Sequence, residues 1–99
     1  VIAIHGCGGG AQQALVGGLD GPLKMAIGQA ISALGIDTRV EDHQFPATEP
    51  KNICNRGRRS VGVQVEMTMP LRLQGPRDAL AAAIRSVLLA LPNCSFGGG

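Results

Sequence analysis

The segment SVGVQVEM (60–67) constrains the fold of this chain more than any other stretch. Valine or methionine occupies every second position of it, while Gly62, Gln64 and Glu66 occupy the positions between. Because successive side chains of a strand point to opposite sides, this alternation predicts a strand with one apolar and one polar face. The apolar face needs other elements to cover it, and Pro70 ends the pattern soon afterwards.

Two predicted helices can cover that face. Asp20 is a suitable N-cap, Gly21-Pro22 begins the first helix, and Gly35 is placed to end it. Gly75-Pro76 begins the second helix and Pro92 ends it. Both carry apolar residues at helical spacing, namely Leu23, Ile27, Ala30, Ile31 and Leu34 in the first and Leu80, Ile84, Val87, Leu88 and Leu91 in the second.

Two further segments predict strands. VIAIH (1–5) is a short apolar run typical of a buried strand in a parallel sheet, and IDTRV (36–40) alternates like a strand near an edge. Residues 6–18 and 41–60 are expected to be loops, the second long enough to carry function. The order β-α-β-loop-β-α predicts an α/β fold, in which helices pack on a small, mainly parallel sheet.

The composition excludes several classes of protein. The 99 residues include only two aromatic side chains and carry a net charge of +2, so no nucleic-acid partner is expected. Three cysteines without C-x-x-C spacing indicate neither a disulfide scaffold nor a zinc knuckle. No stretch reaches the roughly 18 apolar residues of a membrane helix, and no signal peptide is visible. No membrane partner is therefore predicted, and the compartment stays open between the cytoplasm and release by lysis.

The beginning of the chain suggests a larger domain. It has no initiator methionine and starts within a predicted strand. Three strands alone would leave exposed sheet edges. We therefore expect residues 1–92 to be a partial domain that pairs with an N-terminal half, and residues 93–99 to be a Gly-rich tail.

The segment HGCGGGAQ (5–12) allows two interpretations. Gly6-x-Gly8-x-x-Ala11 matches the dinucleotide fingerprint, but that motif must open a helix towards the pyrophosphate. Gly17-Gly18 would interrupt such a helix after about two turns. Alternatively, His5 at a strand end is a metal ligand and the glycines leave room for a bound group. A histidine satisfied by a backbone carbonyl is the simpler alternative.

Charged residues add two further candidate sites. A carboxylate such as Glu66, flanked by Val65 and Met67, is costly in a strand unless it is paired, binds a metal or acts as an acid or base. An exposed face with an arginine partner is the alternative. The positive cluster of NICNRGRRS is either a clamp for an anionic substrate or a solvated basic loop.

The strings IHGC, GGLD and above all NICNRGRRSVGVQVEMT resemble the phage-type poly-γ-glutamate hydrolase family, zinc-dependent enzymes with a zinc-carboxypeptidase-like α/β fold. The resemblance extends from about residue 1 to about residue 91 and is most specific over 50–67. It implies that His5 is the third zinc ligand and Glu66 the catalytic base. It also implies that substrate is bound by a set of loop residues, Asn55, Arg56, Arg58 and Arg59.

The family's first two zinc ligands, a His and a Glu, lie upstream of the IHGC strand, and this chain contains neither. The resemblance therefore implies the C-terminal half of a zinc enzyme that hydrolyses amide bonds in poly-γ-glutamate or a similar anionic γ-glutamyl polymer. The alternatives are a zinc amidase acting on cell-wall peptides and a non-catalytic remnant that binds anionic ligands. The sequence leaves open whether the chain binds zinc alone, its oligomeric state, and whether cleavage is endo or exo.

Overall fold

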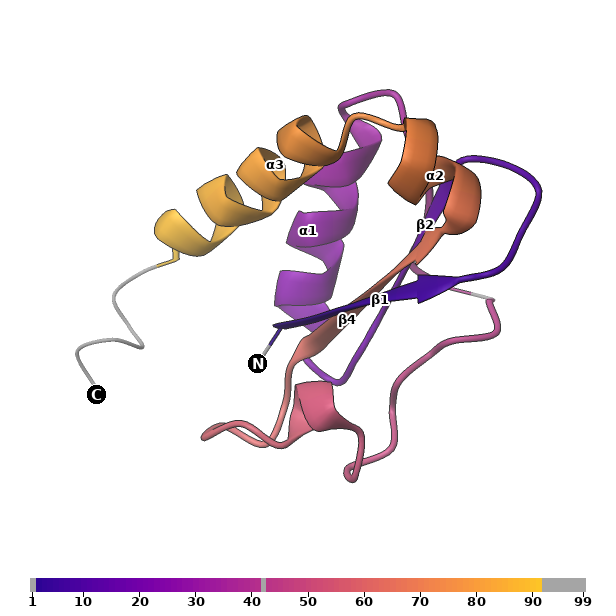
Figure 1. The fold of residues 1–99 in the computed structure, drawn as a ribbon. Helices are drawn as coiled ribbons and strands as arrows, with labels where there is room; N and C mark the ends of the chain where they lie inside the picture. Colours follow the sequence, from indigo (N-terminus) through magenta and orange to yellow (C-terminus); the bar gives the residue numbers. More distant parts are fainter. Residues whose placement is uncertain (1, 42, 92–99) are drawn as a thin grey trace.

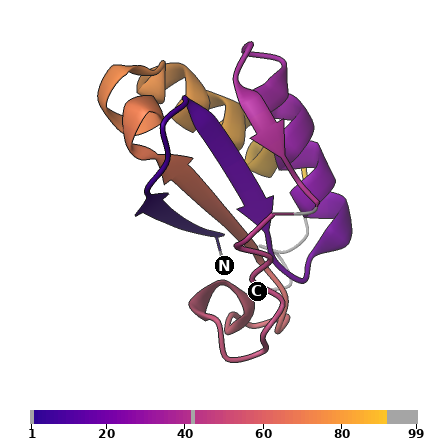
Figure 2. The same ribbon diagram turned by 90° about the vertical axis from the view of Figure 1, so that its right-hand side faces the viewer.

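The computed structural model describes residues 2–41 and 43–91, so the predicted tail at 93–99 and the helix end at Pro92 lie outside the described residues. One sheet has the strand order β1-β4-β2-β3, and α1 and α3 pack on one of its faces (Figures 1 and 2). The elements are β1 (Ile2–Cys7), β2 (Gln13–Gly17), α1 (Gly21–Ser32), β3 (Asp37–Arg39), the short 3-10 helix η1 (Ile53–Asn55), β4 (Val63–Thr68), α2 (Met69–Gln74) and α3 (Arg77–Leu89).

Strand β4 is the alternating segment of the sequence and lies inside the sheet. It pairs in parallel with β1 and antiparallel with β2, and all its residues are buried. Val63, Val65 and Met67 belong to a core that also contains residues of both covering helices, Ile27, Ile31, Leu80 and Ile84. Full burial of such a side chain contributes roughly 1.5–3 kcal/mol. The expected division into an apolar and a polar face is therefore what fixes β4 in the sheet.

Helix α1 begins as its sequence predicts and ends slightly earlier, at Ser32. The Asp20 carboxylate accepts a hydrogen bond of 3.2 Å from the backbone N–H of Leu23, and Gly35 has a φ of +84° just beyond the last turn. Ile27 is fully buried, but Leu34 is 39% exposed because the helix ends at Ser32, before that residue. Leu34 was therefore wrongly predicted to face the core.

The segment 6–18, predicted to be a loop, contains strand β2. Ala14, Leu15 and Val16 are all buried, because the strand lies between β4 and β3 with other groups against both faces. A strand buried on both sides shows no alternation, which is why its sequence gave no period-2 signal. Two of the three strand pairings are parallel, β1–β4 and β2–β3, so the sheet is mainly parallel as expected.

Strand β1 occupies an edge of the sheet and is not the buried strand that its apolar sequence predicted. Among the described residues it pairs only with β4, and Ile4 is 54% exposed. Strand β3 forms the opposite edge, in agreement with the prediction for 36–40.

Helix α2 was not predicted. Pro70 ends the strand as expected, but it also lies in the first turn of a new six-residue helix, where a missing N–H costs nothing. None of the helices in the described ranges has both the length and the apolar character needed to cross a bilayer.

Gly17 and Gly18 lie where β2 leaves the sheet between two other backbone segments. Gly18 donates a hydrogen bond of 2.8 Å to the Pro46 carbonyl and has a φ of +122°. A Cβ at Gly18 would overlap the carbonyl oxygen of Gly62 and lie 2.8 Å from the Cα of Val63. The point where the chain passes between these two backbone segments, which we call the crossing, therefore needs a residue without a side chain.

We expect Gly18→Ala to lower the free energy of unfolding by about 2–4 kcal/mol, because it combines backbone strain with overlap against immobile backbone atoms. Urea unfolding followed by circular dichroism measures this change. Gly8→Ala is the matched control, because a Cβ there has no neighbour within 4 Å. Equal stabilities of the two variants would contradict this explanation of the crossing.

Candidate functional site

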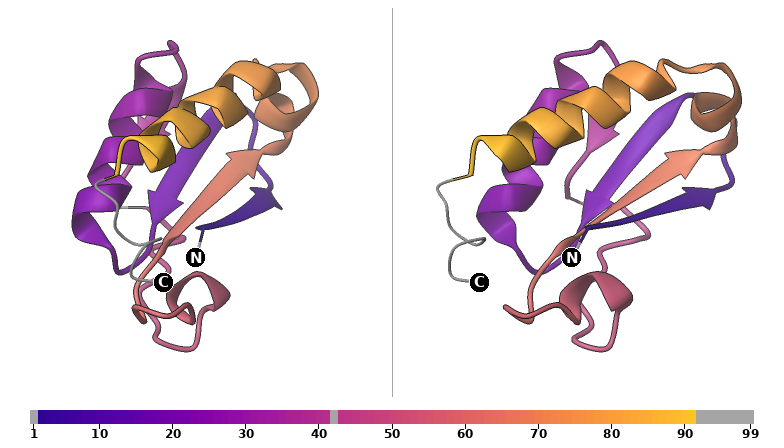
Figure 3. Two further views of the ribbon diagram at one scale, coloured as in Figure 1. Left: turned by 90° about the vertical axis from the view of Figure 1, so that its left-hand side faces the viewer. Right: turned by 60° about the vertical axis from the view of Figure 1, so that its left-hand side comes forward.

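The face of β4 turned away from α1 and α3 carries Gln64, Glu66 and Thr68, and all three are buried. The registers place His5 of β1 and Leu15 of β2 on either side of Glu66. Paired residues of neighbouring strands share a face, so the three side chains form a row across the sheet. The three strands lie side by side in both views of Figure 3.

His5 and Glu66 are in direct contact. His5 Nδ1 lies 3.1 Å from Glu66 Oε2, and the exposed side-chain fractions are 45% for His5 and 6% for Glu66. When Glu66 is ionised its carboxylate only accepts hydrogen bonds, so Nδ1 carries the proton and Nε2 the free lone pair. Nε2 has no hydrogen-bond partner among the described residues, which leaves it available as a metal ligand. The two residues thus lie side by side on neighbouring strands.

Cys7 follows His5 on the same face of β1. Burial raises the pKa of the Cys7 thiol, the nearby Glu66 carboxylate raises it further, and the Arg72 guanidinium partly offsets both effects. A raised pKa disfavours the thiolate, which is the form that binds metals. In the absence of a metal ion Cys7 is therefore mainly a thiol.

The fit to a zinc ion is incomplete. A catalytic zinc takes three protein ligands and one water. Within residues 2–41 and 43–91, no group of three or more histidine, cysteine, aspartate or glutamate side chains could hold a metal ion. The described residues offer one ligand position at His5 and do not form a complete zinc site.

Asn55, expected to bind substrate, is buried, and its amide is fully used by the backbone. Its Oδ1 accepts hydrogen bonds of 3.1 Å from the N–H groups of Leu19 and Gly62. Its Nδ2 donates to the carbonyls of Ala47 and Glu49 at 2.7 and 3.0 Å. An amide has two donors and two acceptor positions, so Asn55 keeps no hydrogen bond for a ligand. The structure gives it the role of tying the long loop to the ends of β2 and β4.

Arg56, Arg58 and Arg59 are exposed in the loop before β4, which Figure 1 shows beyond the start of that strand. Glu66 is the fourth residue of β4 and so lies about 10 Å along it. Arg59 is 3.9 Å from the Asp20 carboxylate with 66% of its side chain exposed, an ion pair of little energy. No described contact joins these arginines to the His5–Glu66 pair.

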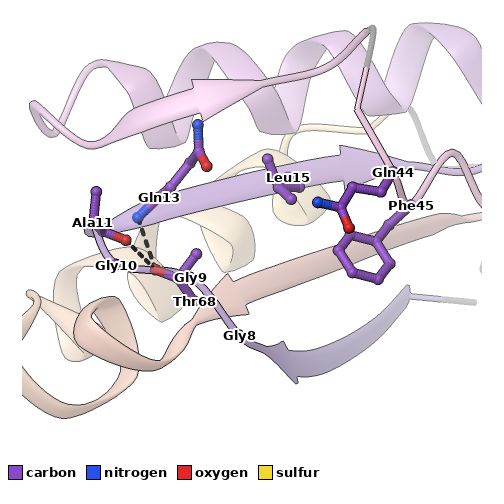
Figure 4. Close-up of a pocket in the computed structure, with 9 residues that line it drawn as sticks. All are labelled: Gly8, Gly9, Gly10, Ala11, Gln13, Leu15, Gln44, Phe45 and Thr68. Carbon is purple, nitrogen blue, oxygen red and sulfur yellow. Dashed lines mark hydrogen bonds between the residues drawn. The ribbon is translucent and has the colours of Figure 1, made fainter.

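The glycine loop leads into strand β2 and not into a helix. No helix N-terminus follows it to receive a pyrophosphate, which removes the physical basis of the dinucleotide interpretation. Instead, the loop forms one wall of a cavity of about 380 Å³ (Figure 4). The cavity lies on the sheet face turned away from α1 and α3, which we call the open face. The cavity is lined by Gly8, Gly9, Gly10, Ala11, Gln13, Leu15, Gln44, Phe45 and Thr68.

Sequence patterns did not identify Gln44 and Phe45 as site residues. The loop that carries them is held by His43, whose Nε2 donates to the Val16 carbonyl at 2.8 Å and whose Nδ1 accepts from the Phe45 N–H at 3.1 Å. His43 is partly buried and anchors this loop. Phe45 is an aromatic residue in an otherwise polar loop, and this is the sequence signal that could have pointed to the cavity.

We expect Asn55→Ala to lower the free energy of unfolding by about 2–4 kcal/mol, because the substitution leaves buried backbone groups without partners. Thermal or urea unfolding measures the loss. The exposed neighbour Arg56→Ala is the control and should change stability by less than about 0.5 kcal/mol. If Asn55→Ala were as stable as Arg56→Ala, the structural role would be refuted and a binding role would regain support.

Comparisons with known proteins show the family and the fold of this chain. A family model described as poly-gamma-glutamate hydrolase matches residues 1–78. A solved bacteriophage poly-gamma-glutamate hydrolase superposes with a TM-score of 0.81 at 27% identity, over 89% of this chain and 51% of that one. The zinc-free apo form of YNDL superposes with a TM-score of 0.78 at 22% identity, over 90% of this chain and 52% of that one. No functionally curated protein matches. The chain thus spans about half the length of the solved structures it matches.

Proposed function

Because the chain belongs to the poly-gamma-glutamate hydrolase family, we propose that it supplies the general base and one metal ligand for hydrolysis of amide bonds in poly-γ-glutamate or a similar γ-glutamyl polymer. The family match supports the substrate class. The contact between the exposed ring of His5 and the buried carboxylate of Glu66 supports the chemistry. It is the single observation that carries the proposal.

We propose Glu66 as the base. Its carboxylate accepts a proton from the attacking water and returns it to the nitrogen of the leaving amine. The rigid central strand holds this carboxylate, and the contact with His5 orients it. A base fixed in this way loses little freedom when substrate binds.

We propose His5 as a zinc ligand through Nε2. A bound zinc ion would acidify a water molecule and polarise the substrate carbonyl. The other ligands would come from outside the described residues, in the part of the matched fold that this chain does not cover. The edge strand β1, with Ile4 exposed, is where we place the pairing with that N-terminal half.

The arginine cluster has a different part in this proposal. Arg56, Arg58 and Arg59 are distant from Glu66 along β4, so they would meet carboxylates of polymer residues away from the scissile bond. Exposed guanidinium groups bind such carboxylates with modest, salt-sensitive energy.

In the full natural polypeptide that carries these residues, we expect Glu66→Gln to reduce kcat for poly-γ-glutamate by about 10²–10⁴-fold, because the amide cannot take up the proton. Zinc content, measured by elemental analysis, should stay unchanged. Glu41→Gln, at an exposed loop position, is the control and should retain activity. If Glu66 only oriented the His5 ring, zinc affinity would fall by about 10–100-fold instead. If the Glu66→Gln variant hydrolysed the polymer at the full rate, the role of Glu66 as the base would be refuted.

His5→Ala in the same polypeptide should lower zinc occupancy and hydrolysis together, because it removes one of three expected protein ligands. Cys7→Ala, on the same face of the same strand, is the matched control and should keep its zinc. Unchanged metal content in His5→Ala would exclude His5 as a ligand.

A further inference from the structure

The cavity on the open face lies on the β2 side of Glu66, opposite His5, and is lined by neighbours of Glu66. The sheet order places β1 on one side of β4 and β2 on the other. Leu15 of β2, in register with Glu66, lines the cavity, and so does Thr68, two residues beyond Glu66 on the same face. A molecule in the cavity would therefore lie against Leu15 and Thr68, the residues next to the proposed base on this face.

The cavity walls suit a chain of methylene and amide groups. Figure 4 shows Phe45 and Gln44 beyond Leu15, with the glycine loop on the other side of the space. Thr68 and Gln13 are already engaged, since the Thr68 hydroxyl donates to the Ala11 carbonyl and the Gln13 amide donates to Asp37. That leaves an aromatic ring, a leucine and the Gln44 amide to meet a ligand. A γ-linked glutamyl residue offers a pair of methylene groups next to an amide in its main chain.

Each such residue also carries a free carboxylate, and Arg39 is placed to receive it. Arg39 of β3 is in register with Leu15, so the row on this face runs His5, Glu66, Leu15, Arg39 across all four strands. Two strand spacings put the Cα of Arg39 about 10 Å from that of Glu66. Arg39 is exposed and forms no ion pair with any described residue. The acidic side chain nearest along its strand, Asp37, holds the Gln13 amide.

We propose that the cavity and Arg39 together form a subsite for one glutamyl residue next to the scissile bond. The methylene groups pack against Phe45 and Leu15, the main-chain amide pairs with Gln44, and the free carboxylate pairs with Arg39. This inference rests on the proposed function and adds a determinant of linkage. An α-linked glutamate has its methylene groups in the side chain and its carboxylate at their end, and would present these groups in a different order.

Calorimetric titration of the full natural polypeptide carrying Glu66→Gln, with γ-linked tetraglutamate as the probe, tests the subsite. Adding Phe45→Ala or Arg39→Gln should each weaken binding by about tenfold. Phe45→Leu keeps an apolar side chain and should restore most of the loss. Arg85→Gln, at an exposed position of α3 on the opposite side of the sheet, is the charge-matched control. An α-linked tetraglutamate should bind more weakly and respond little to Phe45→Ala.

Two outcomes would overturn the subsite. One is that the Glu66→Gln parent does not bind the probe, and the other is that Phe45→Ala and Arg39→Gln bind it as tightly as Arg85→Gln does. Hydrolysis by the unsubstituted polypeptide, measured in parallel, separates the two proposals. Absence of hydrolysis with intact binding overturns the proposed function alone. Phe45→Ala and Arg39→Gln are also each placed in the polypeptide that keeps Glu66. Hydrolysis with an unchanged KM in both of these variants overturns the subsite alone.

Discussion

The parallel register of β1 on β4 is the constraint on which the rest of the site depends, because it sets His5 beside Glu66. A buried carboxylate without a partner costs several kcal/mol, and Glu66 has only 6% of its side chain exposed. A slip of one residue would turn Glu66 towards the helices and the valines towards the open face. The core beneath α1 and α3 prevents that slip. The hydrophobic pattern of β4 therefore positions its buried carboxylate.

The long loop before β4, residues 41–60, contacts the sheet at two places. At one end Asn55 and Gly18 join the loop to the backbone where β2 and β4 meet, through hydrogen bonds that a ligand would have to displace. At the other end His43 fixes the stretch that brings Phe45 over the open face. A polar loop of this length thus acts partly as a structural brace and partly as the wall of a cavity.

The sequence predicted those features that depend on local pattern. The alternation of 60–67, the Asp20 cap and the apolar faces of two helices all involve residues near one another in the chain, and the structure contains them. Strand β2 escaped prediction because burial on both faces removes the alternation by which a strand is recognised. The position of Phe45 and Arg39 relative to Glu66 depends on pairing between distant segments, which no local pattern encodes. The substrate role of Asn55 was implied by the family resemblance, and its sequence alone gives no sign that its amide bonds the backbone.

The central claim is that His5 and Glu66 form the reactive centre, with a metal ion on the open side of the ring. The most direct test is a crystal structure of the full natural polypeptide with zinc, with the ion located by its anomalous scattering. The account predicts a zinc peak about 2.0–2.1 Å from Nε2 of His5, on the open face of the sheet. A zinc ion bound elsewhere, with the His5–Glu66 contact unchanged, would contradict it.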